Sequence, residues 1–209
     1  MSIKKYLSIL CLSFVLVFMT AACSGTEFHF VSDAEKIIGY LGLTAEEIAE
    51  KTGENVILAH SHQTALSGPR RYGDKEYTLY LTVNENGPIA EYPVGANKTI
   101  ELKEGSVCGF YYFGTIEQPE KNDVMGLDGI ISEMTESYGK PITYEGFTTR
   151  LKSPNELWNC IEAGSSGQYF DDWDVDSPFE VRLTAKYNVN AKVLTVTIRY
   201  ATFIPPNMK

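Results

Sequence analysis

The chain has 209 residues, of which 27 are acidic and 18 are basic, and its formal net charge at neutral pH is -9. Such an excess of acidic side chains repels the phosphate backbone of nucleic acids and therefore excludes nucleic-acid binding. Hydrophobic residues make up 44% of the sequence, which is enough for a buried core in one domain or in two small repeated units.

The N-terminus has the pattern of an export signal. Lys4 and Lys5 precede an apolar run, residues 9–19, that is too short for a stable membrane span. The run ends in residues 20–23, Thr-Ala-Ala-Cys, which resemble the lipobox of bacterial lipoproteins. This resemblance implies a diacylglyceryl group and acyl chains on Cys23 that anchor the mature protein to a bacterial membrane.

A secreted soluble protein is the alternative. The lipobox usually has leucine three residues before the cysteine, where this chain has Thr20, and small residues here also fit an ordinary signal peptidase site. The lipoprotein hypothesis divides the chain into a signal peptide (1–22), a lipidated cysteine with its tether (23–30) and one extracytoplasmic domain (31–206).

Two capping boxes predict short helices at the start of the domain. Residues 32–35, Ser-Asp-Ala-Glu, predict a helix that continues to Leu41, and residues 44–47, Thr-Ala-Glu-Glu, predict a second helix that ends at Gly53. Residues 56–72 have no clear pattern.

Alternation of apolar and polar residues predicts a strand over residues 77–83. The Asn86-Gly87 turn predicts a hairpin whose second strand is an edge strand at residues 88–94, because its two prolines cannot donate to a ladder. Residues 99–103 and 107–113 are expected to pair with each other. The second of these segments is too apolar to lie at an exposed edge.

The second half of the chain begins with helical patterns. Apolar residues at three- and four-residue steps predict one helix over residues 124–138, and Ser153 followed by Pro154 predicts a helix that ends at Gly164. Residues 142–149 are a candidate strand, and residues 164–177 read as a long polar loop.

Residues 179–187 and 192–203 give the clearest strand pair in the sequence, since both alternate between apolar and polar side chains. Helices and runs of strands are segregated along the chain. The sequence therefore predicts an α+β fold, in which an antiparallel sheet packs against short helices.

A possible internal repeat divides the domain into units 31–114 and 120–206. Residues 41–44, Leu-Gly-Leu-Thr, are echoed by residues 125–128, Met-Gly-Leu-Asp. Together with Glu47-Ile48, Gly53 and residues 138–141, Tyr-Gly-Lys-Pro, these segments resemble the BLIP-like proteins, which include β-lactamase inhibitor proteins and the SmpA/OmlA envelope lipoproteins. The resemblance implies helix pairs on an antiparallel sheet and a binding module without catalytic residues. The alternative is two ordinary capped helices.

Aromatic and acidic side chains are mixed in the predicted loop 164–177. Flat aromatic rings beside carboxylates can stack on and hydrogen-bond a sugar or a peptide, so Tyr169, Phe170 and Trp173 are candidate ligand-binding residues. The alternative is a solvated loop whose aromatic side chains pack into the core.

Two weaker metal patterns are present. Asp172, Asp174 and Asp176 have the spacing that opens a calcium loop, but Ser177 and Leu183 replace the glycine and glutamate that an EF-hand requires. A simpler calcium site remains open. His60 and His62 have a metal-like spacing, although the sequence identifies no third ligand.

Cys108 and Cys160 are the remaining cysteines once Cys11 leaves with the signal and Cys23 carries lipid. In an exported protein they either form a disulfide or stay as two unpaired, buried thiols. Neither lies in a C-x-x-C motif, and no nucleophile elbow or phosphate-binding loop is present.

The sequence thus predicts a non-enzymatic lipoprotein of the cell envelope, with no cofactor, that binds an envelope protein or peptide through its sheet face or its aromatic-acidic loop. The alternative is a surface lipoprotein that binds a solute or a glycan.

Overall fold

The computed structural model describes residues 28–60, 63–142 and 151–202. These residues form a seven-stranded antiparallel sheet with the order β1-β2-β3-β6-β9-β8-β7, beside a two-stranded sheet of β4 and β5. The predicted α+β class is confirmed. The strands are β1 (Val56–His60), β2 (Gln63–Tyr72), β3 (Lys75–Val83), β4 (Ile89–Gly95), β5 (Lys98–Leu102), β6 (Val107–Glu117), β7 (Gly167–Asp176), β8 (Phe179–Asn188) and β9 (Val193–Thr202).

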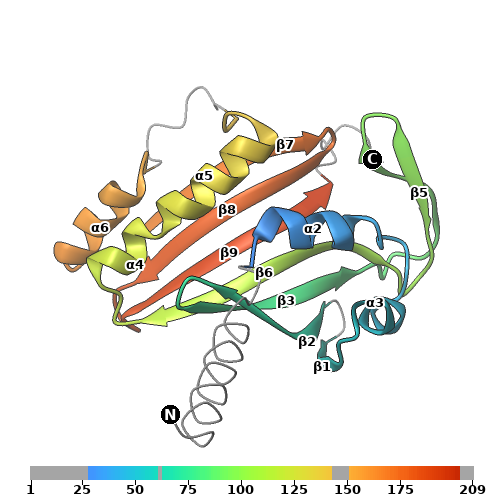
Figure 1. The fold of residues 1–209 in the computed structure, drawn as a ribbon, viewed down its shortest axis with the longest axis horizontal. Helices are drawn as coiled ribbons and strands as arrows, with labels where there is room; N and C mark the ends of the chain where they lie inside the picture. Colours follow the sequence, from blue (N-terminus) through green and yellow to red (C-terminus); the bar gives the residue numbers. More distant parts are fainter. Residues whose placement is uncertain (1–27, 61–62, 143–150, 203–209) are drawn as a thin grey trace, which may run out of the picture.

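Among the described residues, helices lie over one face of the large sheet (Figure 1). They are α2 (Phe30–Ile38), α3 (Ala45–Thr52), α4 (Lys121–Met125), α5 (Leu127–Tyr138) and α6 (Pro154–Glu162). The helices are amphipathic, and α5 buries Leu127, Ile130 and Met134 at three- and four-residue steps. None of the helices in the described part of the chain is long and apolar enough to cross a membrane.

The core lies between the helices and the sheet. Strand β8 buries alternate apolar residues, including Val181 and Leu183, and β3 does the same with Leu79 and Leu81. Strand β6 is central, since it pairs with β3 on one side and with β9 on the other. This position confirms that its apolar segment does not lie at an edge.

The order of elements is similar in the two halves of the chain. Helices α2 and α3 precede β1, β2, β3 and β6, whereas α4, α5 and α6 precede β7, β8 and β9. The halves join where β6 pairs with β9, so that one sheet and one core span both. This order agrees with the predicted units 31–114 and 120–206, but the repeat itself stays a prediction.

The predicted polar loop at residues 164–177 is wrong, because most of it forms the edge strand β7. The strand pairs with β8 along its length. Its pattern is hidden in the sequence because a carboxylate, Asp171, lies between the inward-facing Tyr169 and Trp173, while an aromatic residue, Phe170, points the other way. Polarity therefore does not alternate along this strand.

The predicted hairpin through Asn86-Gly87 is also wrong. Strand β4 pairs with β5, and β3 pairs with β6 instead. The Asn84 amide donates to the carbonyl oxygens of Gly87, at 2.7 Å, and Lys103, at 3.1 Å, and so holds the departing and returning chain together. Because β5 pairs with β4, while β6 pairs with β3 and β9, the predicted pairing of residues 99–103 with residues 107–113 does not form.

The first helix begins two residues earlier than its predicted capping box. Phe30 is fully buried, and Phe28 packs edge-on against it with ring centroids 5.0 Å apart. Burial of these rings outweighs the cap that Ser32 offers. The predicted boundary between tether and domain, between residues 30 and 31, is therefore too late, because Phe28 already belongs to the domain.

Two other helix starts are confirmed. Thr44 forms the predicted capping box with Glu47, and Gly53 ends that helix in a left-handed conformation. Ser153 caps α6, with Pro154 in its first turn. The helix expected over residues 124–138 is present as two helices that meet at Gly126.

The signal peptide, Cys23 and most of the candidate strand at residues 142–149 lie outside the described residues, as do residues 203–206.

A buried ion network ties α2 to β2 and to the chain that follows α3. The Arg70 side chain is 3% exposed and donates to Asp33, at 2.8 Å, and to both carboxylate oxygens of Glu54, at 2.9 and 3.1 Å. The Tyr112 hydroxyl donates to the same Asp33 oxygen, at 3.0 Å. A Cβ at Gly68 would meet the Glu54 carboxylate, so a larger residue here would displace that carboxylate from its position against Arg70.

Glu133 provides a pH-dependent contact between α5 and the start of α2. One carboxylate oxygen accepts a hydrogen bond from the Val31 amide at 2.8 Å, whereas the other is buried without a hydrogen-bond partner among the described residues and lies 3.8 Å from His29 Nδ1. Burial raises the pKa of this carboxyl above its ordinary value of 4.5. Its contribution to stability is therefore full below that value and is lost as pH rises through the folded-state pKa.

We expect Glu133→Gln to keep the acceptor for Val31 and to remove the cost of a buried charge. Thermal unfolding at about pH 4.5 and about pH 8 measures this effect, because the variant should gain stability relative to wild type at the higher pH. Equal differences at the two pH values would contradict it.

Candidate binding face

The sheet face that points away from the helices, called here the open face, brings together side chains from most of the sheet. Successive cross-strand partners form one row. Along it, aromatic side chains are followed by cationic ones and then by an acidic one. Directly opposed side chains have Cβ atoms about 5 Å apart. The row is Ala65, Tyr80, Tyr111, Arg199, Arg182 and Asp172, on β2, β3, β6, β9, β8 and β7.

An aromatic cluster of Tyr80, Tyr111 and Phe113 occupies the first part of this face. The Tyr80 and Tyr111 rings stack with centroids 5.0 Å apart and an interplanar angle of 7°. Phe113 meets Tyr80 edge-on, with centroids 6.3 Å apart. All three side chains are only partly buried, so part of each ring is accessible to a ligand.

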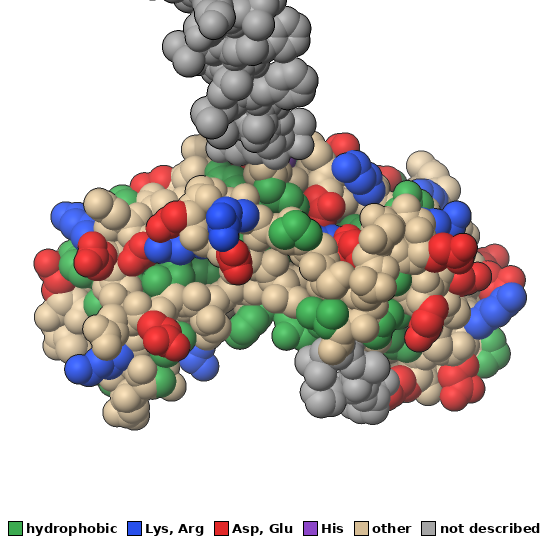
Figure 2. Space-filling view, turned by 60° about the horizontal axis from the view of Figure 1, so that its bottom comes forward, with side chains coloured by type: hydrophobic (Ala, Val, Ile, Leu, Met, Phe, Trp, Pro, Cys, Tyr) green, Lys and Arg blue, Asp and Glu red, His purple; other side chains and the backbone are tan. Residues whose placement is uncertain are grey.

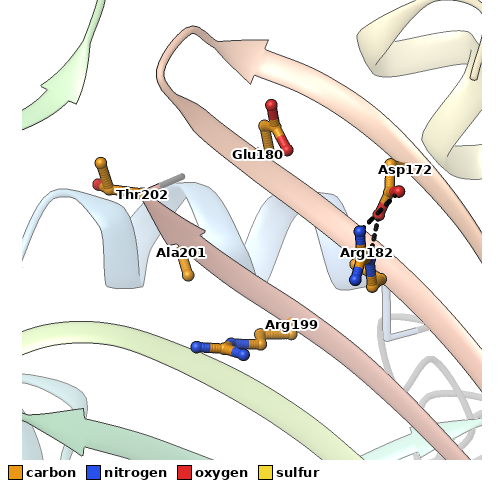
Figure 3. Close-up of a pocket in the computed structure, with 6 residues that line it drawn as sticks. All are labelled: Asp172, Glu180, Arg182, Arg199, Ala201 and Thr202. Carbon is orange, nitrogen blue, oxygen red and sulfur yellow. Dashed lines mark hydrogen bonds and ion pairs between the residues drawn. The ribbon is translucent and has the colours of Figure 1, made fainter. Parts of the chain in front are cut away.

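Beside the aromatic cluster lies a shallow depression of about 230 Å³ on β7, β8 and β9 (Figure 3). Asp172 is 1% exposed at its wall, and its carboxylate accepts two hydrogen bonds from Arg182, one of them at 3.0 Å. The Arg182 guanidinium also lies 5.4 Å from the centre of the Phe170 ring. The depression is lined by Asp172, Glu180, Arg182, Arg199, Ala201 and Thr202.

Arg199 differs from its neighbour Arg182. Its side chain extends away from the Asp172–Arg182 pair (Figure 3). It is exposed and makes no ion pair or hydrogen bond with any residue that the structure describes. Its charge acts on Tyr111, where burial raises the pKa of the hydroxyl and Arg199 opposes the rise.

Acidic side chains gather on the opposite side of the depression. The pKa of Glu180 is raised, first by burial and then by the neighbouring carboxylates of Asp172 and Asp174, while Arg182 opposes this rise. The depression is therefore polarised, with an accessible cation toward the aromatic cluster and carboxylates toward the edge strand β7.

The molecule is hollowed on the side of the open face. The turn that relates the two views directs the face opposite the helices downward in Figure 2, where the lower outline forms a hollow between two lobes. Hydrophobic side chains gather in this hollow. The β4–β5 hairpin borders one end of the sheet, since Thr202 donates to the Pro93 carbonyl at 2.6 Å and the Ala96 amide donates to Asp176 at 3.0 Å.

Tyr169 and Trp173, two of the three predicted ligand-binding residues, do not lie on the open face. Both side chains face the helices, and their exposed fractions are 2% and 0%. The Trp173 indole also donates to the Thr135 hydroxyl of α5, at 3.4 Å. Of the three predicted aromatic residues, only Phe170 lies on the open face, where it contacts Arg182.

The three aspartates of the calcium prediction have separate environments. Asp172 is paired with Arg182, and Asp176 accepts from the Ala96 amide, while Asp174 is exposed. Within residues 28–60, 63–142 and 151–202, no three metal-binding side chains come together. Calcium binding stays a prediction. His62 and the side chain of His60 lie outside the described residues.

The predicted disulfide between Cys108 and Cys160 does not form in the structure, where both are free thiols. Cys108 lies on β6 and donates to the Thr82 carbonyl oxygen at 3.5 Å, while Cys160 lies on α6. Burial raises the pKa of the Cys108 thiol, which disfavours the reactive thiolate. Both cysteines are partly buried, in agreement with the alternative of unpaired thiols.

No protein-family model, curated protein or solved structure matches this chain. One signal in the sequence points to the open face. Strand β6 has aromatic residues on both faces, with Phe110 and Tyr112 in the core and Tyr111 and Phe113 on the open face. Aromatic side chains that continue onto a solvent-facing side indicate a contact surface.

Proposed function

We propose that the protein is a non-enzymatic binding module of the bacterial cell envelope, anchored by lipid on Cys23, and that it binds an envelope protein or peptide on its open face. The proposal rests on the accessible aromatic cluster beside the exposed Arg199. Tyrosine and arginine are enriched among the residues that carry most of the energy of protein interfaces.

The shape of the open face favours a polypeptide over a small solute. Its depression is shallow and open to solvent, with a volume of about 230 Å³. Small-molecule sites are usually clefts of about 300 to 1,000 Å³ that enclose most of the ligand. Glycan or solute binding remains the alternative function.

The proposed anchor would keep the domain close to the membrane. Phe28, which packs against the core, follows Cys23 by five positions in the sequence. An extended segment of this length spans at most about 18 Å, at roughly 3.5 Å per residue. Partners in or near the same membrane would therefore be within reach of the open face.

Capture of partners from a detergent-solubilised envelope extract tests the proposal, with the full-length protein as bait. We expect the double variant Tyr80→Ser/Tyr111→Ser to recover at least about tenfold less of a stoichiometric protein partner than wild type, because it removes the stacked rings. Tyr40→Ser is the matched control, since Tyr40 is a partly buried tyrosine that lies against Lys51 of α3.

Thermal unfolding of each bait verifies that it is folded. Equal recovery of the partner by the wild-type protein and the double variant would contradict a role of the open face. Recovery of a glycan that the double variant no longer retains would favour the alternative function.

A further inference from the structure

We infer that the partner is a polypeptide segment that places an acidic side chain on Arg199 and an aromatic or aliphatic side chain on the adjacent aromatic cluster. This inference rests on the proposed function, and it adds the chemistry of the segment that is bound.

Among the arginines that the structure describes, Arg199 is set apart by the lack of a carboxylate partner. Arg70, Arg71 and Arg182 each pair with a carboxylate. The chain has 27 acidic residues, yet none of those described reaches the guanidinium of Arg199. An exposed guanidinium has five N–H donors and binds a carboxylate through two parallel hydrogen bonds.

Its surroundings would strengthen such a bond. Arg199 directly opposes Tyr111 across β9 and β6, and Tyr111 stacks on Tyr80. A partner that covers these rings excludes water from the edge of the guanidinium, and a charged hydrogen bond is stronger where the local dielectric constant is lower. The same partner therefore needs both an acidic and an apolar group.

The spacing of the two groups follows from the sheet. The Cβ atom of Tyr111 lies about 5 Å from the Cβ atom of Arg199, since the two residues are directly opposed on neighbouring strands. The Cβ atom of Tyr80 is about 10 Å from that of Arg199, at two strand spacings. Side chains at positions i and i+2 of an extended segment, or i and i+4 of a helix, lie about 5 to 7 Å apart on one face. A bound segment thus has its acidic and apolar residues two to four positions apart.

The charges on this face disfavour other anions. Asp172, Asp174 and Glu180 lie on the far side of the depression, and they would repel a doubly charged phosphate more strongly than a single carboxylate. A flat anionic bilayer does not fit a hollowed face (Figure 2) and is repelled by a chain with a net charge of -9. A protruding polypeptide segment satisfies both constraints.

Selection from a displayed library of random dodecapeptides tests this inference, with the detergent-solubilised full-length protein as the target. Wild type should enrich peptides that carry Asp or Glu two to four positions from an aromatic or aliphatic residue. Arg199→Glu should weaken binding of a selected peptide by at least about tenfold and should enrich Lys or Arg in its own selection.

Lys186→Glu is the matched control. Lys186 is an exposed cation on the open face, on β8, and its substitution makes the same change in net charge. It should leave the selected sequences unchanged. Peptides that lose binding in Tyr80→Ser/Tyr111→Ser but carry no enriched acidic residue would overturn this inference alone. Peptides that bind this double variant as well as wild type, or no enrichment at all, would overturn the proposed function with it.

Discussion

Replacement of Trp173 by alanine is expected to lower the free energy of unfolding by about 3 to 5 kcal/mol. Trp173 is fully buried between β7 and the helices, and its indole donates to Thr135 on α5. The substitution removes the largest buried side chain of the core and leaves a cavity, because neighbouring side chains collapse only partly. Urea unfolding followed by circular dichroism measures the loss.

Phe170→Ala is the control for this prediction. Phe170 lies three positions away on the same strand but points to the open face, where its ring lies 5.4 Å from the Arg182 guanidinium. Its loss should cost about 1 kcal/mol. A stable Trp173→Ala variant that has lost only partner binding would contradict the structure and restore a ligand-binding role for this residue.

Arg70→Ala is the second substitution with a large expected effect, again a loss of about 3 to 5 kcal/mol in the free energy of unfolding. Removal of the guanidinium leaves the carboxylates of Asp33 and Glu54 without their common cation, with only 22% and 13% of these side chains exposed. Two partly buried negative charges would then lie close together, and the penalty of their burial would no longer be offset.

The adjacent Arg71 gives the matched comparison. It pairs with Glu76, but both side chains are mostly exposed, and such surface pairs contribute about 1 kcal/mol or less. Arg71→Ala should therefore unfold at nearly the same urea concentration as wild type. Equal effects of the two substitutions would show that the Arg70 network does not hold α2 to the sheet.

Local patterns predicted those elements whose signals lie within a few residues. The capping box at Thr44, the cap at Ser153 and the alternation in β3, β8 and β9 all correspond to elements of the structure. The partners of the strands could not be predicted in the same way. The Asn86-Gly87 turn favours a local hairpin, but β3 gains more by pairing with β6, whose apolar residues require a central position.

The candidate site was harder to predict because its residues are far apart in the sequence. Tyr80, Tyr111 and Arg199 become neighbours only through the order of β3, β6 and β9 in the sheet. The sequence predicted a site at residues 169–173, where aromatic and acidic residues are adjacent. Both residue types occur on both faces of β7, so the sequence did not show which side chains are buried. The sheet face, which the sequence also proposed, is where the accessible cluster lies.

Photo-crosslinking in cells is the most direct test of the claim that the open face binds an envelope partner. A photoreactive phenylalanine analogue would replace Tyr80 on the open face and, as the control, Ser132, which is exposed on α5. We expect one envelope protein to be crosslinked from position 80 and not from position 132. A crosslink from position 132 alone, or from neither position, would contradict the proposed binding face.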